Sequence, residues 1–257
     1  MSSRTFWFCL TFMAAAYLLF WLLLIGASAS YSDSQTWITT LAKPEIRYSI
    51  GLSLVTSTTA AVMASFVAIP IGYLMSRRTF PAKTWVDAAL DIPIVLPPMV
   101  VGLCLLIFFQ TQLGKAIETV LPFTYTIAGV ILAQFVVAAA FAIRTVRSTF
   151  DHLSPRPEEV ALTLGATRFQ AFWQIGLPSA RRGLIAAFCI AWARSLGEFG
   201  PILVFAGTTR FKTEVLPTTI WLELSAGNLE TAVTISLLMI LMAIIVLVIV
   251  RATGERI

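Results

Sequence analysis

Two opposite charges lie within one long apolar segment of the sequence. Arg194 and Glu198 interrupt the otherwise uncharged stretch 183–209, and their spacing places them on one face of a helix. A charged side chain at membrane depth is costly when it faces lipid, so it is usually paired or turned toward a bundle interior. We therefore expect an Arg194–Glu198 ion pair inside a helix bundle. The pair either fixes helix packing or lines a route for a solute, and the sequence leaves both roles open.

Glycine and proline residues accompany these charges and predict irregular backbone. Gly200 follows shortly after Glu198, and Pro97 and Pro98 adjoin in another apolar segment. Glycine permits close backbone approach, and proline removes a backbone donor. Irregular backbone at membrane depth is tolerated where it is buried in protein or lines a cavity. The candidates for a translocation path or gate are therefore Arg194, Glu198, Gly200, Pro97 and Pro98, although the two prolines are equally compatible with simple kinks.

A polar stretch at 147–182 predicts two short helices joined by a glycine. Pro157 suits the first turn of a helix, and Glu158 and Glu159 suit the positive end of its dipole. Gly165 is a typical helix stop, and a second helix is expected near 168–174. The expected product is an elbow of two helices.

The second helix of this elbow is rich in aromatic residues. Phe169, Phe172 and Trp173 lie within it, and we expect Leu177 and Pro178 to end it, because the residue before a proline avoids the helical region. Exposed apolar side chains in a loop indicate either a partner-binding surface or an amphipathic helix that lies on the membrane.

The spacing of residues in the elbow resembles the coupling-helix signature of ABC importer permeases. The pattern Glu-x-Ala-x3-Gly-x9-Ile-x-Leu-Pro is matched from Glu159 to Pro178, with Val160 where the family often has a second alanine. In such permeases the elbow docks into a groove of the ATPase subunit. The resemblance implies that the ATPase-coupling residues are Glu159, Ala161, Gly165, Phe169, Ile175, Leu177 and Pro178.

Three further segments resemble the molybdate, tungstate and sulfate branch of these permeases. They are 96–102, 193–200 and 212–218, and the third is closer to the molybdate/tungstate branch. The resemblance covers about 52–251 and implies import of a tetrahedral oxyanion, molybdate or tungstate first and sulfate or thiosulfate as the alternative. The implied partners are a second permease copy in a homodimer, two cytoplasmic ATPase subunits, an external substrate-binding protein and the lipid bilayer.

Composition independently predicts an integral membrane protein. Of 257 residues, 58% are hydrophobic and only 12% are charged, which excludes a disordered chain, a nucleic-acid-binding module and an ordinary soluble enzyme. We expect one all-α permease domain over 1–257 with six transmembrane helices. The predicted spans are 6–27, 49–75, 91–111, 124–145, 183–206 and 230–250.

Basic residues predict the orientation of these spans. Twelve Lys and Arg residues fall in the segments on one side and five on the other, so the positive-inside rule places both termini and the elbow in the cytoplasm. The expected location is the cytoplasmic (inner) cell membrane. The first span begins like a signal peptide, but its apolar run is too long for one.

The sequence contains no pattern typical of an enzyme. It lacks a Gly-x4-Gly-Lys-Ser/Thr loop, so ATP and Mg²⁺ are expected on the partner ATPase and no cofactor on this chain. His152 is the single histidine and has no companion ligands in sequence, so no metal site is expected. An ion-coupled secondary transporter is the alternative class, although it has no use for a coupling elbow.

Overall fold

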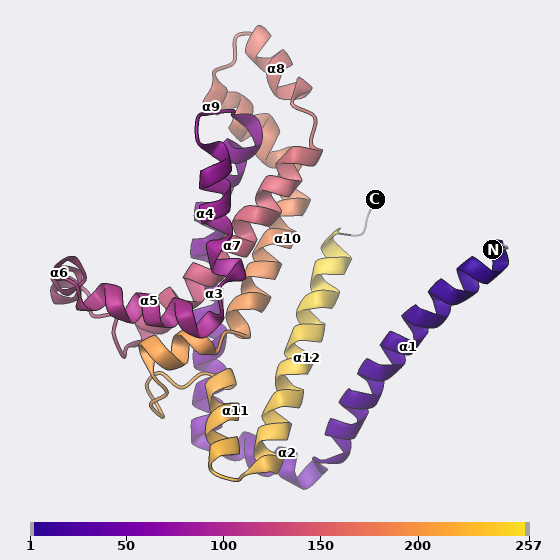
Figure 1. Cartoon of the computed structure of the whole chain (residues 1–257), viewed down its shortest axis with the longest axis vertical. Helices are drawn as coiled ribbons and strands as arrows, with labels where there is room; N and C mark the ends of the chain where they lie inside the picture. The colour runs from indigo at the N-terminus through magenta and orange to yellow at the C-terminus, as the bar shows by residue number, and fades with distance from the viewer. Residues whose placement is uncertain (1–2, 255–257) are drawn as a thin grey trace.

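The computed structural model describes residues 3–254, and this range is helical without β-strands (Figure 1). The predicted all-α fold class is therefore confirmed. The elements are α1 Ser3–Ser30, α2 Ser34–Ala42, α3 Pro44–Arg77, α4 Lys83–Val95, α5 Pro98–Gln110, α6 Gln112–Val120, α7 Ile127–His152, α8 Arg156–Thr163, α9 Arg168–Ala171, the π-helix η1 Phe172–Gly176, α10 Leu177–Leu196, the π-helix η2 Ile202–Ala206, α11 Leu216–Ser225 and α12 Leu229–Gly254.

Three helices, α3, α7 and α10, form the centre of the molecule (Figure 1). Their contact faces are made of small residues, which let helix backbones approach closely and are typical of interfaces between membrane helices. The alanines buried there are Ala61, Ala64, Ala68, Ala138, Ala139, Ala142, Ala180, Ala187 and Ala191. At Gly72 of α3 the approach is so close that a Cβ atom would lie 2.7 Å from Val146 Cγ1 and 2.9 Å from the backbone nitrogen of Arg147.

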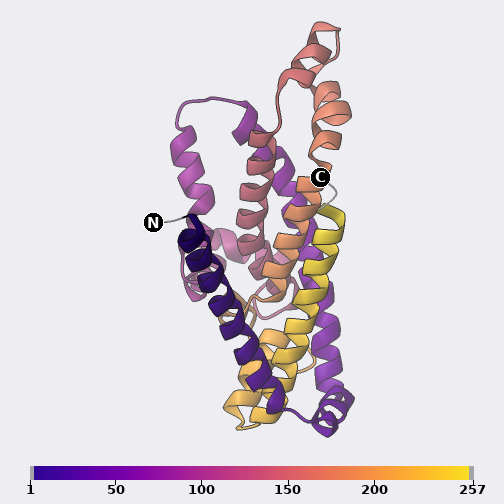
Figure 2. The ribbon, with the colours of Figure 1, turned by 90° about the vertical axis from the view of Figure 1, so that its right-hand side faces the viewer.

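Four predicted spans correspond to single helices that are long and apolar enough to cross a membrane. They are α1, α3, α7 and α12. The central helices are well covered, whereas none of the residues of α1 is buried. Figures 1 and 2 show α1 diverging from the bundle at the end of the molecule where α2 and α11 lie. The apolar surface of α1 is consistent with a lipid or protein environment, not with water.

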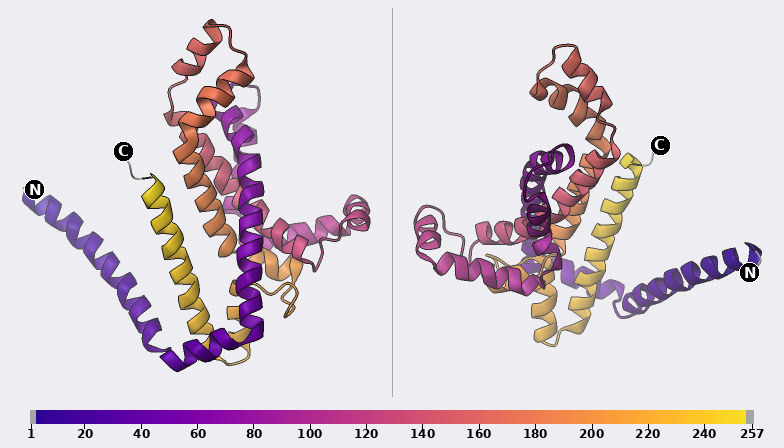
Figure 3. Two further views of the ribbon diagram at one scale, coloured as in Figure 1. Left: turned by 180° about the vertical axis from the view of Figure 1, so that it is seen from behind. Right: turned by 45° about the horizontal axis from the view of Figure 1, so that its top comes forward.

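The predicted span 91–111 is not a straight helix. Its residues fall in α4 and α5, which meet at an angle of 108°. Leu96 between them has an extended backbone (φ −65°, ψ 140°), because the proline that follows disfavours the helical region. Pro97 and Pro98 therefore do more than kink this helix, and α5 projects sideways from the bundle (Figure 3).

The predicted span 183–206 is also interrupted. The helix α10 ends at Leu196, and after a short break the chain continues as η2. The helix α10 contains three charged residues, Arg181, Arg182 and Arg194, and is therefore less apolar than the four helices that can cross a membrane alone. The two interruptions fall in the segments that the sequence marks by proline and glycine.

The elbow and the short helices at the other end lie far apart along the bundle axis. The helices α8 and α9 form one tip of the molecule, and α2 and α11 lie at the opposite end (Figure 1). The described ends of α1 and α12 both point from that opposite end toward the side of the elbow (Figures 1 and 3).

The α3–α7 contact predicts a sharp difference between two glycines of the same helix. Gly72→Ala inserts a methyl group against Val146 and the α7 backbone, and such overpacking costs about 1–3 kcal/mol. Gly51→Ala meets nothing within 4 Å and serves as the matched control. We expect a clear fall in the midpoint of thermal unfolding in detergent for Gly72→Ala and none for Gly51→Ala. Equal midpoints would show that α3 and α7 are not packed as described.

Candidate functional site

The two charges in the fifth predicted span form the expected ion pair. Arg194 Nη1 lies 3.1 Å from Glu198 Oε2. The Glu198 side chain is 1% exposed and the Arg194 side chain 32% exposed, so the carboxylate depends on this partner far more than the guanidinium does. The guanidinium also lies over the ring of Phe141, 5.5 Å from its centroid. Glu198 itself belongs to the break that follows α10.

The break after α10 rests against the break between α4 and α5. A Cβ atom on Gly200 would lie 3.1 Å from Pro98 Cβ and 2.9 Å from the backbone nitrogen of Met99. One turn further, a Cβ atom on Gly102 would lie 2.7 Å from Pro201 Cα. Glycine is therefore required at both positions by close backbone approach. The structure thus brings Gly200 and Pro98 together, although Pro97 and Pro98 are both exposed at the bend.

Polar groups buried beside this contact are only partly satisfied. Gln134 of α7 donates from Nε2 to the backbone oxygen of Ser195 at 3.1 Å, and the Glu198 nitrogen donates to the same oxygen at 3.2 Å, so this carbonyl at the end of α10 has two donors. Among the described residues, Gln134 Oε1 and Ser195 Oγ are buried without a hydrogen-bond partner, and buried Glu198 Oε2 has the ion pair with Arg194 but no hydrogen bond. This cluster is a polar seam within an apolar bundle, and polar groups of this kind mark functional positions in membrane proteins.

The elbow has the two helices that the sequence predicts. The first, α8, is followed by Gly165 with φ +92°, a conformation that L side chains rarely adopt. The second begins with a capping box, in which Thr167 Oγ1 accepts from the nitrogen of Gln170 and Gln170 Oε1 accepts from the nitrogen of Thr167. The chain reversal is thus fixed by backbone conformation and capping.

The expectation that Leu177 and Pro178 end the second helix is wrong. The chain passes from α9 through η1 directly into α10. In this π-helical turn the nitrogen of Leu177 donates to the oxygen of Phe172, five residues back. The wider turn leaves room for Pro178, which then occupies the first turn of α10, where its missing N–H is no loss. The elbow is therefore continuous with α10.

The predicted coupling residues do not share one environment. Glu159, Gly165, Phe169 and Pro178 are exposed, whereas Ala161, Ile175 and Leu177 are half-buried and support the elbow from within. Exposed apolar side chains beyond the predicted set enlarge the surface, and Phe169 stacks on Trp173 at 6.0 Å. We call Val160, Leu164, Phe169 and Trp173 the elbow patch, and they are between 57% and 83% exposed.

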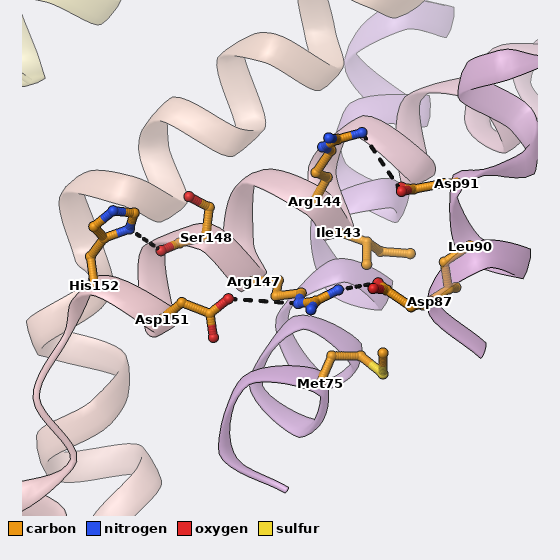
Figure 4. Close-up of a pocket in the computed structure, with 10 residues that line it drawn as sticks. All are labelled: Met75, Asp87, Leu90, Asp91, Ile143, Arg144, Arg147, Ser148, Asp151 and His152. Atoms are coloured by element: carbon orange, nitrogen blue, oxygen red, sulfur yellow. Dashed lines mark hydrogen bonds and ion pairs between the residues drawn. The ribbon is translucent and has the colours of Figure 1, made fainter. Parts of the chain in front are cut away.

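A charged cavity of about 340 Å³ lies between α4 and α7 (Figure 4). Arg147 forms ion pairs with Asp87 and Asp151, and Arg144 lies 3.6 Å from Asp91. Each arginine of the cavity is thus balanced by an aspartate, so the cavity holds no uncompensated positive charge for an anion. Its role is to hold α4 against α7 by ion pairs.

Sequence reasoning missed the residue that fixes the elbow to the bundle. Glu158 precedes the predicted coupling residue Glu159, and it is buried in contact with Tyr73 and Arg77 of α3. The sequence suggested only that Glu158 favours the start of α8. No local pattern links residues so far apart in the chain, and only the folded arrangement reveals the contact.

A family model of the binding-protein-dependent transport system inner membrane component matches residues 68–257. The chain belongs to this family of ABC permeases. The match includes the elbow and both helix breaks. The family is that of the transport subunit and not of the ATPase.

Two relatives of this permease are named for the anions that they transport. The chain is 30% identical over 237 residues to the sulfate transport system permease protein CysT of Escherichia coli (strain K12), with 91% of this chain and 85% of that protein covered. It is 35% identical over 175 residues to the molybdate/tungstate transport system permease protein WtpB of Thermococcus kodakarensis, with 68% and 67% covered.

Solved structures support the same permease fold. A chain of the bacterial alginate ABC transporter, in complex with a periplasmic protein bound to alginate pentasaccharide, has a TM-score of 0.76 at 16% identity, with 98% of this chain and 96% of that chain covered. A chain of the MetNI methionine ABC transporter has a TM-score of 0.63 at 19% identity, with 82% and 99% covered.

The exposures of Arg194 and Glu198 predict an asymmetric double-mutant cycle. Removing one member of a buried ion pair costs about 3–5 kcal/mol, because the other charge is stranded. Arg194→Ala strands the buried carboxylate and should destabilise more than Glu198→Ala, which leaves a partly exposed guanidinium. The double variant should recover part of the loss in thermal stability in detergent. Strictly additive losses would contradict a direct pair.

Proposed function

We propose that this permease forms the path of an ATP-driven importer for a tetrahedral oxyanion, molybdate or tungstate first and sulfate as the alternative. The observation that carries the proposal is the family match together with relatives named for sulfate and for molybdate/tungstate at 30–35% identity. These anions share shape and charge, which explains why one permease architecture serves them all. High-affinity selection among them is assigned to the external binding protein.

The elbow is proposed as the docking element for the ATPase subunit. The elbow patch exposes apolar side chains at a tip of the molecule, away from the bundle. Exposed apolar patches of this kind mark protein interaction sites. Glu159 is exposed beside the elbow patch, and its charge would orient the elbow on the ATPase. In this proposal ATP binding closes the two ATPase subunits, and the elbows of two permease copies move with them.

The two helix breaks are proposed as the gate of the path. They bring Gly200, Pro98 and the Arg194–Glu198 pair to one region of the bundle. A lone carboxylate would repel a divalent anion, and Arg194 offsets that charge. The partly exposed guanidinium can face the route while Glu198 stays buried. Pro97, at the outside of the bend, acts in this scheme as the hinge of α5.

The remaining parts of the proposal concern topology and assembly. The helices α1, α3, α7 and α12 each cross the membrane once. Six crossings result if α4 and α5 together form one further crossing, and α10 and η2 together form another. The permease then lies in the inner membrane with both termini and the elbow in the cytoplasm, as the positive charges of the loops predict. Two copies of the chain form a homodimer with one elbow for each ATPase. An external binding protein delivers the anion.

The proposed function is tested by reconstituting the permease with its ATPase and binding protein in proteoliposomes. We expect uptake of radiolabelled molybdate, tungstate or sulfate that requires ATP inside and continues without an ion gradient. Uptake driven by a sodium or proton gradient without ATP would favour a secondary transporter and overturn the proposal. Comparing the three anions with one another assigns the substrate.

The elbow variants belong to the same experiment. Gly165→Val forces a β-branched residue into a left-handed backbone, and Glu159→Lys reverses the exposed charge. Both variants should insert in the membrane but lose co-purification with the ATPase and anion uptake. Arg156→Ala, an exposed residue at the start of α8, serves as the control that keeps both. Normal transport by Gly165→Val or Glu159→Lys would show that the elbow does not dock the ATPase.

Topology is predicted separately by cysteine accessibility. In a variant without Cys9, Cys104 and Cys189, single cysteines at Ser34 and Thr209 should react with an impermeant maleimide from outside intact cells. A cysteine at Ser154 should react only after the membrane is permeabilised. External labelling at position 154 would invert the proposed orientation.

A further inference from the structure

A buried polar junction joins the elbow to two helices of the bundle, α3 and α7. Glu158 of α8 is 8% exposed. The hydroxyl of Tyr73 donates to Glu158 Oε2 at 2.5 Å, and Arg77 donates from Nε and Nη2 to Oε1 at 3.3 and 3.2 Å. Tyr73 and Arg77 lie one turn apart in the last part of α3. We call Tyr73, Arg77 and Glu158 the elbow junction.

The junction also contacts α7 and lies close to Gly176, the last residue of η1. Arg77 donates from Nη1 to the backbone oxygen of Phe150 in α7 at 2.8 Å, and its guanidinium lies 5.8 Å from the Phe150 ring centroid. At the end of η1, a Cβ atom on Gly176 would lie 3.3 Å from Glu158 Cδ and Oε1. The carboxylate is therefore held between α3 and the residue that leads into α10.

Aromatic packing holds the hydroxyl of this junction in place. The Tyr73 ring meets Phe150 edge-on at 5.1 Å and Phe172 of η1 at 4.6 Å. These contacts fix the ring between α7 and the elbow, so the hydroxyl has little freedom to leave Glu158. The guanidinium is fixed as well, because its fork is shared between a carboxylate and a backbone oxygen.

No second link of this kind connects α8 with α3 among the described residues. The hydrogen bonds and ion pairs between these two helices all end on the carboxylate of Glu158. The other main neighbours of α8 are α9 and η1, which belong to the elbow itself. A displacement of α8 therefore reaches α3 chiefly through this one carboxylate.

We propose that the elbow junction is the point at which movement of the docked elbow is passed to α3 and α7, while α10 is continuous with the elbow through η1. This inference rests on the proposed function, in which an ATPase moves the elbow. Glu158 is then a positioning residue that faces the bundle, while its neighbour Glu159 faces the ATPase. Of these two adjacent carboxylates, Glu159 would contribute to docking of the ATPase, and Glu158 would transmit the movement to the bundle.

The inference is tested by the amount of anion imported per ATP hydrolysed. Glu158→Ala removes the carboxylate, and Tyr73→Phe removes only one hydroxyl. Both variants should still co-purify with the ATPase and hydrolyse ATP, because the elbow patch and Glu159 are unchanged. Import per ATP should fall about fivefold or more in Glu158→Ala, as expected for loss of a coupling interaction, and by a smaller factor in Tyr73→Phe. A merely structural role would reduce the amount of folded protein but leave this ratio unchanged.

Two matched variants sharpen the comparison. Arg78→Ala removes an exposed arginine next to Arg77 and should leave the ratio at the wild-type value. Arg77→Lys keeps the charge but cannot bridge Glu158 and the Phe150 oxygen with one planar fork, so its ratio should lie between those of wild type and Glu158→Ala.

Each outcome decides between the two proposals. A wild-type ratio in Glu158→Ala and Tyr73→Phe overturns the inference alone, and so does loss of the ATPase from the Glu158→Ala complex, since that residue would then belong to the docking surface. If Glu158→Ala does not accumulate, the ratio of Tyr73→Phe decides. A wild-type permease that binds no ATPase overturns the proposed function, and the inference with it.

Discussion

Close contact between α3, α7 and α10 is the constraint on which the rest of the structure depends. Alanines and Gly72 bring these helices together so tightly that one added methyl group meets a neighbouring backbone. In a bilayer, water does not drive helices together, so close van der Waals packing has to hold the bundle. A rigid centre of this kind lets the peripheral helices break, bend and diverge without loss of the fold. It also makes the ends of the three helices on the side of the elbow a single rigid unit on which the elbow can act.

The two helix breaks show how polar backbone is accommodated next to this centre. At the end of α10, the carbonyl of Ser195 accepts from the side chain of Gln134 and from the backbone of Glu198. The bend before α5 is covered on one side by the chain around Gly200. Each break is thus packed against protein, as irregular backbone at membrane depth must be. Two interrupted helices in mutual contact also form a deformable region, because neither has a continuous hydrogen-bond ladder to lose when it moves.

Sequence reasoning could predict the parts of the structure that depend on local pattern. The length of the apolar segments predicted the helical class and the four spans that are single helices, and the glycine at position 165 predicted the turn of the elbow. The Arg194–Glu198 pair followed from spacing on one helix. Contacts between distant segments were out of reach: the 108° bend requires knowing which surface covers it, and Glu158 is identified only when Tyr73 is seen beside it. The error at Pro178 arose because a π-helical turn can absorb a proline that an α-helix excludes.

The turn at Gly165 selects residues by the handedness of the backbone and not by their volume. Its φ of +92° disfavours every L side chain, although a Cβ atom there would meet nothing within 4 Å. Asparagine and aspartate, which visit the left-handed region more readily than other residues, would therefore be the least unfavourable replacements, and valine and isoleucine the most unfavourable. Tolerance at this position would follow stereochemistry alone, whereas at Gly72 it would follow size.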